Sequence, residues 1–311
     1  MNNPEVLILS TKYDYSTDYI CIELEKRKIP FLRINRDMFS SYKMLIDLQN
    51  KKLDIVFNNS RFTVTSATLR AVYYRAPVFL RNSKPYSVEE QLARGQWSAF
   101  IRNLIIFDKA KWVNHPVKTY QAENKLFQLQ VAKEVGLEVP YTLCGNMIPT
   151  ELSDDMYVIK SLDTALFYDN GTEMFTYSSI IEQAELKVAQ ISEAPVIIQQ
   201  LIQNKTDIRV TYVGGHMYPV SIEDNQGGIV GDWRKTPREV LHYTSISIPE
   251  TVKGMLQSLM NKLELNFGGI DLALSDGKYY FIEVNPTGEW GWLKKTTGCP
   301  IDVAIVDILE G

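Results

Sequence analysis

The sequence predicts an α/β protein assembled from several α+β lobes. Residues 6–35 alternate between apolar runs and an amphipathic stretch, which is the pattern of a βαβ unit. Apolar residues recur at helical spacing over 88–107 and 119–134, and residues 269–284 have the pattern of two strands joined by a tight turn. With 311 residues, 45% of them hydrophobic, the chain can fill the cores of two or three lobes.

The overall charge and the cysteines limit the classes of partner and compartment. The formal net charge is -4 and the isoelectric point about 5.6, so no basic field would attract nucleic acid or an anionic membrane. Cys21, Cys144 and Cys299 lie far apart and are odd in number, which argues against a disulfide framework. No apolar stretch reaches membrane-spanning length, and the first one is too short for a signal peptide. We therefore expect a cytoplasmic protein.

The first domain is predicted over residues 1–115. Its expected elements are strands 6–10, 31–35, 54–57, 62–64 and 71–74 and helices 17–28 and 88–107. The connection at 11–16 contains no glycine. A dinucleotide-binding turn needs glycines there to let a pyrophosphate approach, so this sheet is not expected to bind NAD.

Two further lobes are predicted, over 116–198 and 199–311. A helix over 119–134, closed by Gly136, opens the smaller central lobe. The remaining strands and helix are expected at 196–202, 208–213, 250–263, 269–274 and 279–284. The dipeptide Asp276-Gly277, between the last two strands, is a strong hairpin turn.

Three oxygen-bearing side chains interrupt this last, strongly apolar pair of strands. Side chains alternate along a strand, so Glu283 and Asn285 share one face, and Asp271 on the antiparallel neighbour can meet them there. Hard oxygen ligands suit Mg²⁺, which is usually held by one or two carboxylates together with substrate phosphates. The alternative is a hairpin with solvated acids, the usual position of a charged side chain. The apolar setting favours the metal site, with a nucleoside triphosphate nearby.

These residues resemble the last motif of the ATP-grasp superfamily, in which an Asp, a Glu and an Asn lie on such a hairpin. The resemblance implies the ATP-grasp fold, with an N-terminal pre-ATP-grasp βαβ domain, a small central lobe and a C-terminal lobe. It also implies ATP and two magnesium ions as cofactors, with Asp271, Glu283 and Asn285 as metal ligands. Lys125, at the start of a helix, and Lys160, at the end of an apolar strand, are similar to the superfamily's two lysines, which contact the nucleotide phosphates.

Three other segments resemble further motifs of the superfamily. Segment 197–202 is similar to the hinge whose backbone binds adenine, which implies ATP-binding roles for Gln199, Gln200, Leu201 and Ile202. Asp207 and Arg209 are similar to an Asp-x-Arg strand in which the acid lies near the ribose and the arginine near the reacting groups. Arg234 falls where related peptide ligases place an arginine against the triphosphate and acyl phosphate, an anionic target that suits a guanidinium. The implied catalytic residues are Lys160, Arg209 and Arg234.

The chain also resembles ribosomal-peptide maturases of the microviridin type, the graspetide synthetases. Segment 161–176 stands where most relatives have a glycine-rich phosphate loop, 71–77 resembles the tyrosine-arginine-proline strand end of their N-terminal domain, and 285–293 resembles their extended terminal motif. The resemblance covers essentially the whole chain and implies an ADP-forming ligase. Such an enzyme activates Glu or Asp side chains of a ribosomal precursor peptide as acyl phosphates and joins them to Ser/Thr hydroxyls or Lys amines, giving macrocyclic esters or amides. The implied partner is the leader and core of that peptide, and we also expect a homodimer.

Two alternatives stay open at this point, because fold alone cannot select a substrate. A ligase that adds an amino acid to a small molecule or a protein tail would use the same nucleotide machinery and differ only in its acceptor. A nucleotide-binding interaction protein without turnover would be favoured if motif residues were absent. Lys160, Asp271 and Glu283 are all present, which makes that reading the weakest.

Overall fold

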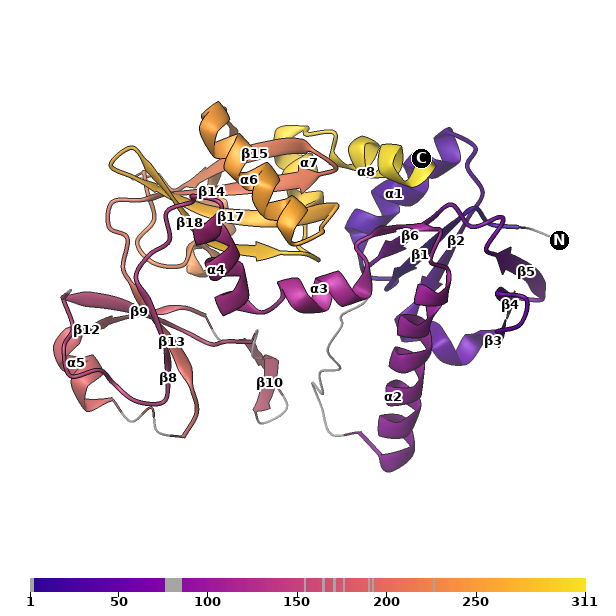
Figure 1. Cartoon of the computed structure of the whole chain (residues 1–311), viewed down its shortest axis with the longest axis horizontal. Coiled ribbons are helices and arrows are strands. Elements are labelled where there is room, and N and C mark those ends of the chain that lie inside the picture. Colours follow the sequence, from indigo (N-terminus) through magenta and orange to yellow (C-terminus); the bar gives the residue numbers. More distant parts are fainter. Residues whose placement is uncertain are drawn as a thin grey trace.

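The computed structural model describes residues 3–75, 86–153, 155–163, 166–169, 172–175, 177–189, 191, 193–225 and 227–311. Figure 1 shows three sheet-containing parts: an N-terminal part from which α2 projects, a C-terminal sheet beside it, and a central sheet below the C-terminal one. The mixture of helices and strands confirms the predicted α/β class. Within the described residues, no helix is both long enough and apolar enough to cross a membrane.

A parallel sheet of order β2-β1-β6-β7 forms the centre of the N-terminal part. Its strands are Phe31–Asn35, Val6–Ser10, Ala71–Tyr74 and Lys111–Val113. Every residue of β1 is buried, as expected for a central parallel strand covered on both faces. Helix α1 (Tyr15–Lys26) connects β1 to β2, so the predicted βαβ opening is confirmed.

Shorter elements complete the N-terminal part. A 3-10 turn η1 (Arg36–Ser41) leads into an antiparallel sheet of order β3-β4-β5, formed by Lys43–Asp47, Lys52–Phe57 and Ser60–Thr65. Helix α2 (Val88–Arg102) begins with a capping box between Ser87 and Glu90. It ends in a 3-10 turn, η2 (Asn103–Ile106), so the single helix predicted to residue 107 is too long.

The single helix predicted over 119–134 is wrong, because the structure has two helices there. Helix α3 (Pro116–Ala122) starts with proline in its first turn, and α4 (Lys125–Glu134) starts after Asn124. The Asn124 side-chain amide donates to the carbonyls of Tyr120 and Gln121, 2.9 and 3.1 Å away, and its backbone is extended. Asparagine competes with the helical backbone through local bonds of this kind. The break places Lys125 in the first turn of α4.

The central part is an antiparallel sheet of order β12-β9-β13-β8 with a small core. Its strands are Ser179–Glu182, Met156–Lys160, Val196–Gln200 and Thr142–Gly145. Tyr157, Ile198 and Leu186 form the buried centre, and Leu186 comes from helix α5 (Gln183–Val188). Strands β10 (Leu166–Asp169) and β11 (Thr172–Phe175) pair as a separate hairpin.

The C-terminal part is an antiparallel sheet of order β16-β15-β14-β17-β18. Its strands are His242–Ser245, His216–Glu223, Thr206–Val213, Phe267–Ser275 and Lys278–Asn285. Asp276 and Gly277 have φ of +49° and +73°, as a two-residue hairpin turn requires, so that prediction is confirmed. Two 3-10 turns, η3 (Trp233–Lys235) and η4 (Arg238–Val240), precede β16. Helix α6 (Glu250–Lys262) buries Leu256 in the same core as Phe281 of β18.

The end of the chain returns to the N-terminal part. After the short helix α7 (Gly291–Thr297), helix α8 (Ile301–Glu310) places Ile305 in the same core as Ile8 of β1. Arg27 at the end of α1 pairs with Asp307 of α8 at 2.7 Å. Figure 1 accordingly shows α8 lying beside α1, so the first and last segments of the chain form one packed unit.

Candidate active site

A cavity of about 360 Å³ lies between the central and C-terminal sheets, within the size range of small-molecule sites. It is lined from both sides, by Lys160 of β9 and Gln200 of β13 on one and by Asp271 of β17 and Glu283 of β18 on the other. Of the predicted site residues, those that line it are Lys125, Lys160, Gln199, Gln200, Leu201, Ile202, Asp207, Arg234, Asp271, Glu283 and Asn285. Arg209 is the exception, and it lies against Asp271.

The two carboxylates of the predicted metal site share one face only because strand β18 contains a bulge. Leu272 pairs with Phe281, and a regular ladder would next pair Asp271 with Ile282. That register would turn Glu283 to the opposite face, because neighbouring residues of a strand alternate. The structure instead pairs Asp271 with Glu283, leaving Ile282 as the additional residue. Simple alternation, used to predict this site, is therefore an incomplete reason for it.

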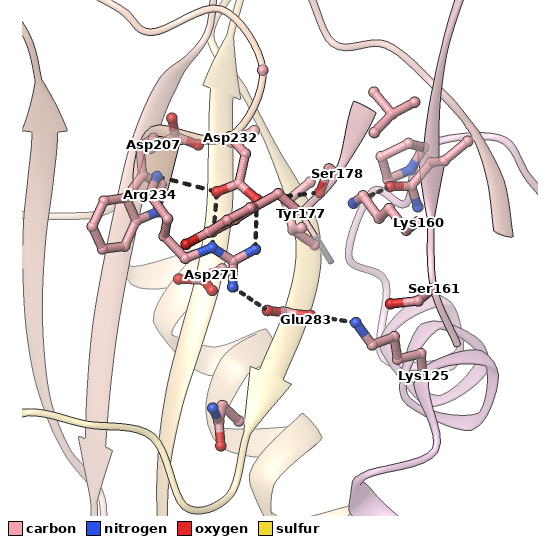
Figure 2. A pocket seen from close by; sticks show the side chains of 18 of the residues that line it. Lys125, Lys160, Ser161, Tyr177, Ser178, Asp207, Asp232, Arg234, Asp271 and Glu283 are labelled. Atoms are coloured by element: carbon pink, nitrogen blue, oxygen red, sulfur yellow. Dashed lines mark hydrogen bonds and ion pairs between the residues drawn. The ribbon is translucent and has the colours of Figure 1, made fainter. Parts of the chain in front are cut away.

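Positive groups surround Glu283, as Figure 2 shows. The Lys125 Nζ lies 3.3 Å from its Oε2, and the Arg234 Nη1 lies 3.8 Å from its Oε1. Burial alone would raise the pKa of Glu283, but Lys125 and Arg234 lower it below its ordinary value. Glu283 is therefore held as a carboxylate.

Asp271 is the less favourably placed acid. Burial raises the pKa of Asp271 to about 6, and the neighbouring Glu283 adds to the rise although Arg209 opposes it. The Arg209 Nε lies 2.9 Å from the Asp271 Oδ1. Two acids side by side in a buried site are the arrangement that a divalent cation neutralises.

The donor set fits magnesium. Asp271 and Glu283 supply carboxylate oxygens, and Asn285, which pairs with Gly269 two residues along the ladder, supplies an amide oxygen. The Asn285 Oδ1 accepts bonds from the amide of Thr287 at 3.0 Å and from the Thr287 hydroxyl at 3.3 Å, so a metal at this oxygen would replace the longer hydroxyl bond. Within the described part of the chain, no three His, Cys, Asp or Glu side chains gather as a metal site, so a site here relies on two carboxylates completed by phosphate oxygens.

Lys160 ends β9 with its ammonium group at the cavity. Its Nζ donates to the Gln199 Oε1 at 2.6 Å, and the Gln199 Nε2 donates in turn to the Thr142 Oγ1 at 2.9 Å. Burial lowers the pKa of Lys160 to about 8; Glu283 opposes this shift, and Lys125 adds to it. The Lys160 ammonium thus donates to a neutral amide, and a charged phosphate oxygen would be a stronger acceptor for it.

Arg234 is oriented by a carboxylate that the sequence did not single out. Asp232, whose side chain is 3% exposed, accepts bonds from the Arg234 Nε at 2.8 Å and from Nη2 at 2.9 Å. Asp232 also accepts a 3.4 Å bond from the Ser178 hydroxyl of the central part. Burial would raise the pKa of Asp232, but the bonds from Arg234 lower it. This fork leaves Nη1 of Arg234 toward Glu283 (Figure 2).

Arg209 lies in a space that two glycines provide. Its row of the sheet continues through Asp271 to Glu283, so the three charged residues lie on adjacent strands. A Cβ atom at Gly269 would overlap the Arg209 Nη1, and one at Gly288 would lie 3.5 Å from it. Arg209 and Glu283 thus lie on opposite sides of Asp271 in this row, with the Arg209 guanidinium against Asp271.

The predicted adenine hinge forms one wall of the cavity. The backbone amide of Gln200 donates to the carbonyl of Tyr141 at 2.9 Å, and Leu201 and Ile202 follow at the end of β13. Asp207 pairs with Lys205, another cavity residue, while burial raises the pKa of Asp207. The cavity is also lined by residues for which no role was predicted: Gln128, Tyr177, Ser178, Gly231 and Trp233.

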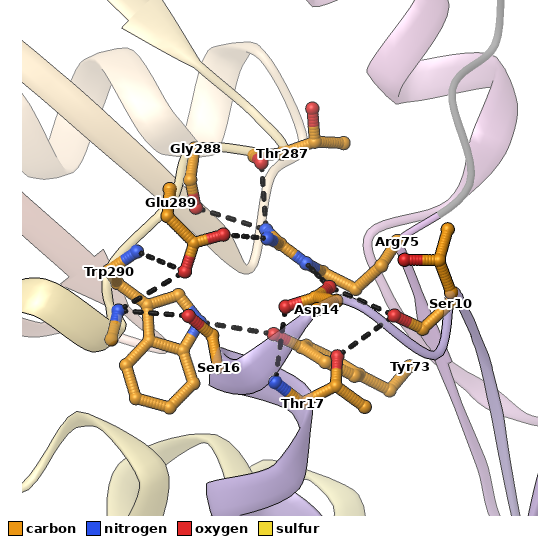
Figure 3. A network of polar contacts seen from close by, with 12 residues as sticks. Ser10, Asp14, Ser16, Thr17, Tyr73, Arg75, Thr287, Gly288, Glu289 and Trp290 are labelled. Carbon is orange, nitrogen blue, oxygen red and sulfur yellow. Dashed lines mark hydrogen bonds and ion pairs between the residues drawn. The ribbon is translucent and has the colours of Figure 1, made fainter.

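A second polar network joins two segments that separately resemble the graspetide synthetases (Figure 3). Arg75, at the end of β6, donates from Nη1 to the carbonyls of Thr287 and Gly288 at 2.7 and 3.0 Å. Its Nη2 lies 3.1 Å from Glu289 and its Nε 3.1 Å from Asp14. The N-terminal part thereby fixes the loop that follows Asn285. Residues 76–77 of the first segment, and 164, 165, 170, 171 and 176 of the segment after Lys160, lie outside the described residues.

No protein-family model matches the chain, and a search of curated proteins gives no match. Solved structures match along its whole length. Macrocyclase MdnC, bound with precursor peptide MdnA from Microcystis aeruginosa MRC, is 25% identical, with a TM-score of 0.82 and 98% of each chain covered. A RiPP-associated ATP-grasp ligase of Chryseobacterium gregarium, in complex with ADP and a leader and core peptide, is 21% identical, with a TM-score of 0.84 over 99% of this chain and 96% of that one.

A third match is the ATP-grasp ligase PsnB, complexed with a phosphomimetic variant of a minimal precursor, Mg and ADP. It is 17% identical, with a TM-score of 0.74 over 98% of this chain and 97% of that one. These similarities extend over the N-terminal part as well as over the two lobes around the cavity. The chain therefore has the ATP-grasp fold, and it is similar along its whole length to a macrocyclase and to RiPP-associated ATP-grasp ligases.

Proposed function

We propose that this chain is an ADP-forming ligase that cross-links a ribosomal precursor peptide. The observation that carries the proposal is the cavity between the two lobes, where Lys125, Lys160 and Arg234 face the carboxylate pair Asp271 and Glu283. Cations beside paired acids suit a triphosphate with its magnesium. The full-length similarity to a macrocyclase and a ligase that are each bound to a peptide supports a peptide substrate. That peptide would supply both the activated carboxylate and the nucleophile of the new bond.

The side chains would divide the work of binding and charge neutralisation. Lys125, Lys160 and Arg234 hold the phosphates, while Asp271, Glu283 and Asn285 hold two magnesium ions. Magnesium, when bound, neutralises the phosphate oxygens and makes the terminal phosphorus more electrophilic. The hinge 199–202 holds the adenine through its backbone, and Asp207 lies toward the ribose. Arg209 supports Asp271 from behind and extends the positive field toward the reacting groups.

The chemistry needs two displacements and no nucleophile from the protein. A Glu or Asp carboxylate of the peptide attacks the γ-phosphorus, the bond from that phosphorus to ADP breaks, and an acyl phosphate forms. A Ser/Thr hydroxyl or a Lys amine then attacks the acyl carbon, inorganic phosphate leaves, and the acceptor proton passes to solvent. Arg234, held by Asp232, and Lys160 stabilise the charge that develops on the transferred group.

The test is a reconstitution with a short precursor encoded next to the gene, with clustered Thr/Ser and Glu/Asp. With Mg²⁺ and ATP, each new bond should lower the peptide mass by one water and release one ADP and one phosphate. The Lys160→Met variant is the matched control and should give neither product. A peptide or small molecule that instead gains whole amino-acid residues would overturn the maturase proposal in favour of an amino-acid ligase. Precursor binding without ADP release would favour a non-catalytic binding protein.

We also propose a homodimer in the cytoplasm and a division into domains 1–115, 116–198 and 199–311. Each range contains a sheet of its own, and strand β13 (Val196–Gln200) spans the second boundary. The free thiols of Cys21, Cys144 and Cys299 suit a reducing compartment. Light scattering of the purified protein tests the dimer, and a mass of about one chain would overturn it.

A further inference from the structure

Strand β18 is an edge strand, and other parts of the chain cover its outer side. The sheet order ends β14-β17-β18, so β18 has one strand neighbour, β17. An edge strand presents unpaired N–H and C=O groups on its free side. Figure 1 shows α4 beside β18, and α4 carries Lys125, the partner of Glu283. The covering helix therefore contacts the strand that bears two of the proposed metal ligands.

Gln128 of α4 takes the place of a neighbouring strand at Val284. The amide of Val284 donates to the Gln128 Oε1 at 2.9 Å, and the Gln128 Nε2 donates to the carbonyl of Val284 at 2.8 Å. The second hydrogen of Nε2 goes to the carbonyl of Ala122. Gln128 is only 3% exposed, so these bonds do not compete with bulk water. Val284 stands between Glu283 and Asn285, so Gln128 fixes the backbone at the centre of the proposed metal site.

A second outer contact lies on the other side of the bulge. The amide of Phe281 donates to the carbonyl of Glu138 at 2.8 Å, just beyond the end of α4. Outward-facing backbone groups of a regular strand recur every second residue, but Phe281 and Val284 are three residues apart. That spacing fits only a strand with one additional residue between them, and Ile282 is that residue.

We propose that Gln128 is a positioning residue that, with the carbonyl of Glu138, holds the bulge in β18 and so keeps Glu283 on the same face as Asp271. The inference rests on the proposed role of that pair in binding magnesium. In the unbulged register Glu283 would pair with Ile270, which is 0% exposed in the apolar core, and Val284 would turn to the cavity. The outer contacts at Phe281 and Val284 allow the bulged register and not the regular one.

The test is the binding of Mn²⁺ together with ADP, followed by electron paramagnetic resonance, which needs no peptide and no turnover. Gln128→Glu is the informative variant, because a neutral carboxylic acid can accept from the Val284 amide and donate to its carbonyl, whereas the ionised form can only accept. We expect Mn²⁺ affinity about tenfold below the wild type at high pH. The ratio of variant to wild type, measured at each pH, should approach one as the pH falls.

Two more variants complete the design. Gln130→Glu makes the same change on the exposed side of α4, where the Gln130 side chain donates to Glu134 on the same helix. This variant should bind Mn²⁺ like the wild type at every pH. Gln128→Leu should weaken Mn²⁺ binding without any dependence of the ratio on pH. If Gln128→Leu fails to fold, the pH dependence of Gln128→Glu decides.

Equal Mn²⁺ affinity of folded Gln128→Glu and wild type across the pH range would overturn the positioning role and leave the proposed function intact. A wild type that binds no Mn²⁺ with ADP would overturn the magnesium assignment itself, and the inference about Gln128 with it. The proposed function and the positioning role therefore fail by different results.

Discussion

At the scale of single residues, the site depends on opposite shifts in the protonation of neighbouring groups. Glu283 sits between Lys125 and Arg234 and keeps its charge, whereas burial and Glu283 itself make Asp271 easier to protonate. Lys160 is easier to deprotonate than a free lysine, because burial and the neighbouring cations disfavour its charged form. Displaced pKa values of both signs in one cavity are typical of a site that binds a highly charged ligand.

Replacing Glu283 by glutamine should remove magnesium-dependent ADP formation while the protein stays folded. The amide keeps the size of the side chain but supplies no negative charge to a metal or to Lys125. Thermal unfolding should occur below the wild-type temperature, because Lys125 and Arg234 lose the carboxylate with which they pair and whose charged form the fold favours. ADP release and the melting temperature are the two measurements. Wild-type turnover at the same magnesium concentration would exclude the metal assignment.

Nucleotide binding should take up protons near pH 8, and Lys160 should be the group that binds them. Below its pKa of about 8 the ammonium is charged and attracts phosphate; as the pH rises through 8 that charge, and part of the affinity, is lost. Bound phosphate favours the charged form, so binding raises this pKa. Calorimetry in buffers of different ionisation enthalpy measures the uptake. Lys160→Arg, which stays charged, should show none, and equal uptake would assign the proton elsewhere.

At the scale of strands and turns, glycine makes the space that the charged side chains occupy. Gly269→Ala should push the Arg209 guanidinium away from Asp271, because a Cβ atom there overlaps Nη1. We expect a loss of about 1–3 kcal/mol in the free energy of unfolding together with slower turnover. Gly254→Ala in α6, where a Cβ atom meets nothing, should instead stabilise by about 0.4–1 kcal/mol. Urea unfolding of both variants measures the contrast, and equal effects would contradict it.

The elements that the sequence predicted are those whose pattern is local. The βαβ opening, the Asp276-Gly277 turn and the apolar strands around it follow from periodicity and turn chemistry alone. Strand β15 was not predicted, and Pro219 inside it gives a physical reason, since proline removes a ladder donor and argues against an interior strand. The structure accommodates Pro219 because its missing N–H would face the end of β16, on the same side as its carbonyl. The Ile246 amide, just after β16, donates to that carbonyl.

The residues that line the candidate site could be predicted from the sequence, but the contacts that position them could not. Charged and amide side chains at motif positions are visible in a sequence, whereas the bulge at Ile282 depends on contacts made by Gln128, more than 150 positions away. Asp232 stands two residues before Arg234 in the sequence, yet its role in orienting Arg234 appears only once both side chains have positions. Tertiary contacts of this kind leave no periodic signal.

At the scale of the whole molecule, the N-terminal part supports the loop at one edge of the cavity. Arg75, with a side chain 7% exposed, holds the carbonyls of Thr287 and Gly288 and pairs with Asp14 and Glu289. The N-terminal part therefore determines where the loop after β18 lies. A truncated protein that lacks it would lose this support even though the nucleotide-binding lobes are intact.

Replacing Arg75 by glutamine should cost about 3–5 kcal/mol in the free energy of unfolding, because it leaves buried Asp14 without its cation. It should also raise the magnesium concentration needed for turnover, since the Thr287 backbone moves with Asn285. Arg27→Gln, which cuts the more exposed pairs between α1 and α8, should cost about 1 kcal/mol or less and leave the magnesium dependence unchanged. Denaturant unfolding and magnesium titration of turnover check both. Equal behaviour of the two variants would argue against a link through Arg75.

Asn114 provides a second connection between the N-terminal part and the C-terminal sheet. Its buried side chain accepts bonds from the Asn266 and Phe267 amides and donates to the carbonyls of Phe267 and Pro286. Asn114 therefore joins the N-terminal part to the C-terminal sheet, close to the loop that Arg75 holds. The central sheet is joined to the C-terminal part by two chain segments, which meet where Gln200 bonds to Tyr141, and by the bond from Ser178 to Asp232. The N-terminal part and the C-terminal sheet thus form one packed unit, and the central sheet is a separate part joined to it. A change in the position of the central sheet would therefore move Lys160 relative to Glu283, whereas Arg234, Asp271 and Glu283 all lie on the C-terminal part and would keep their spacing.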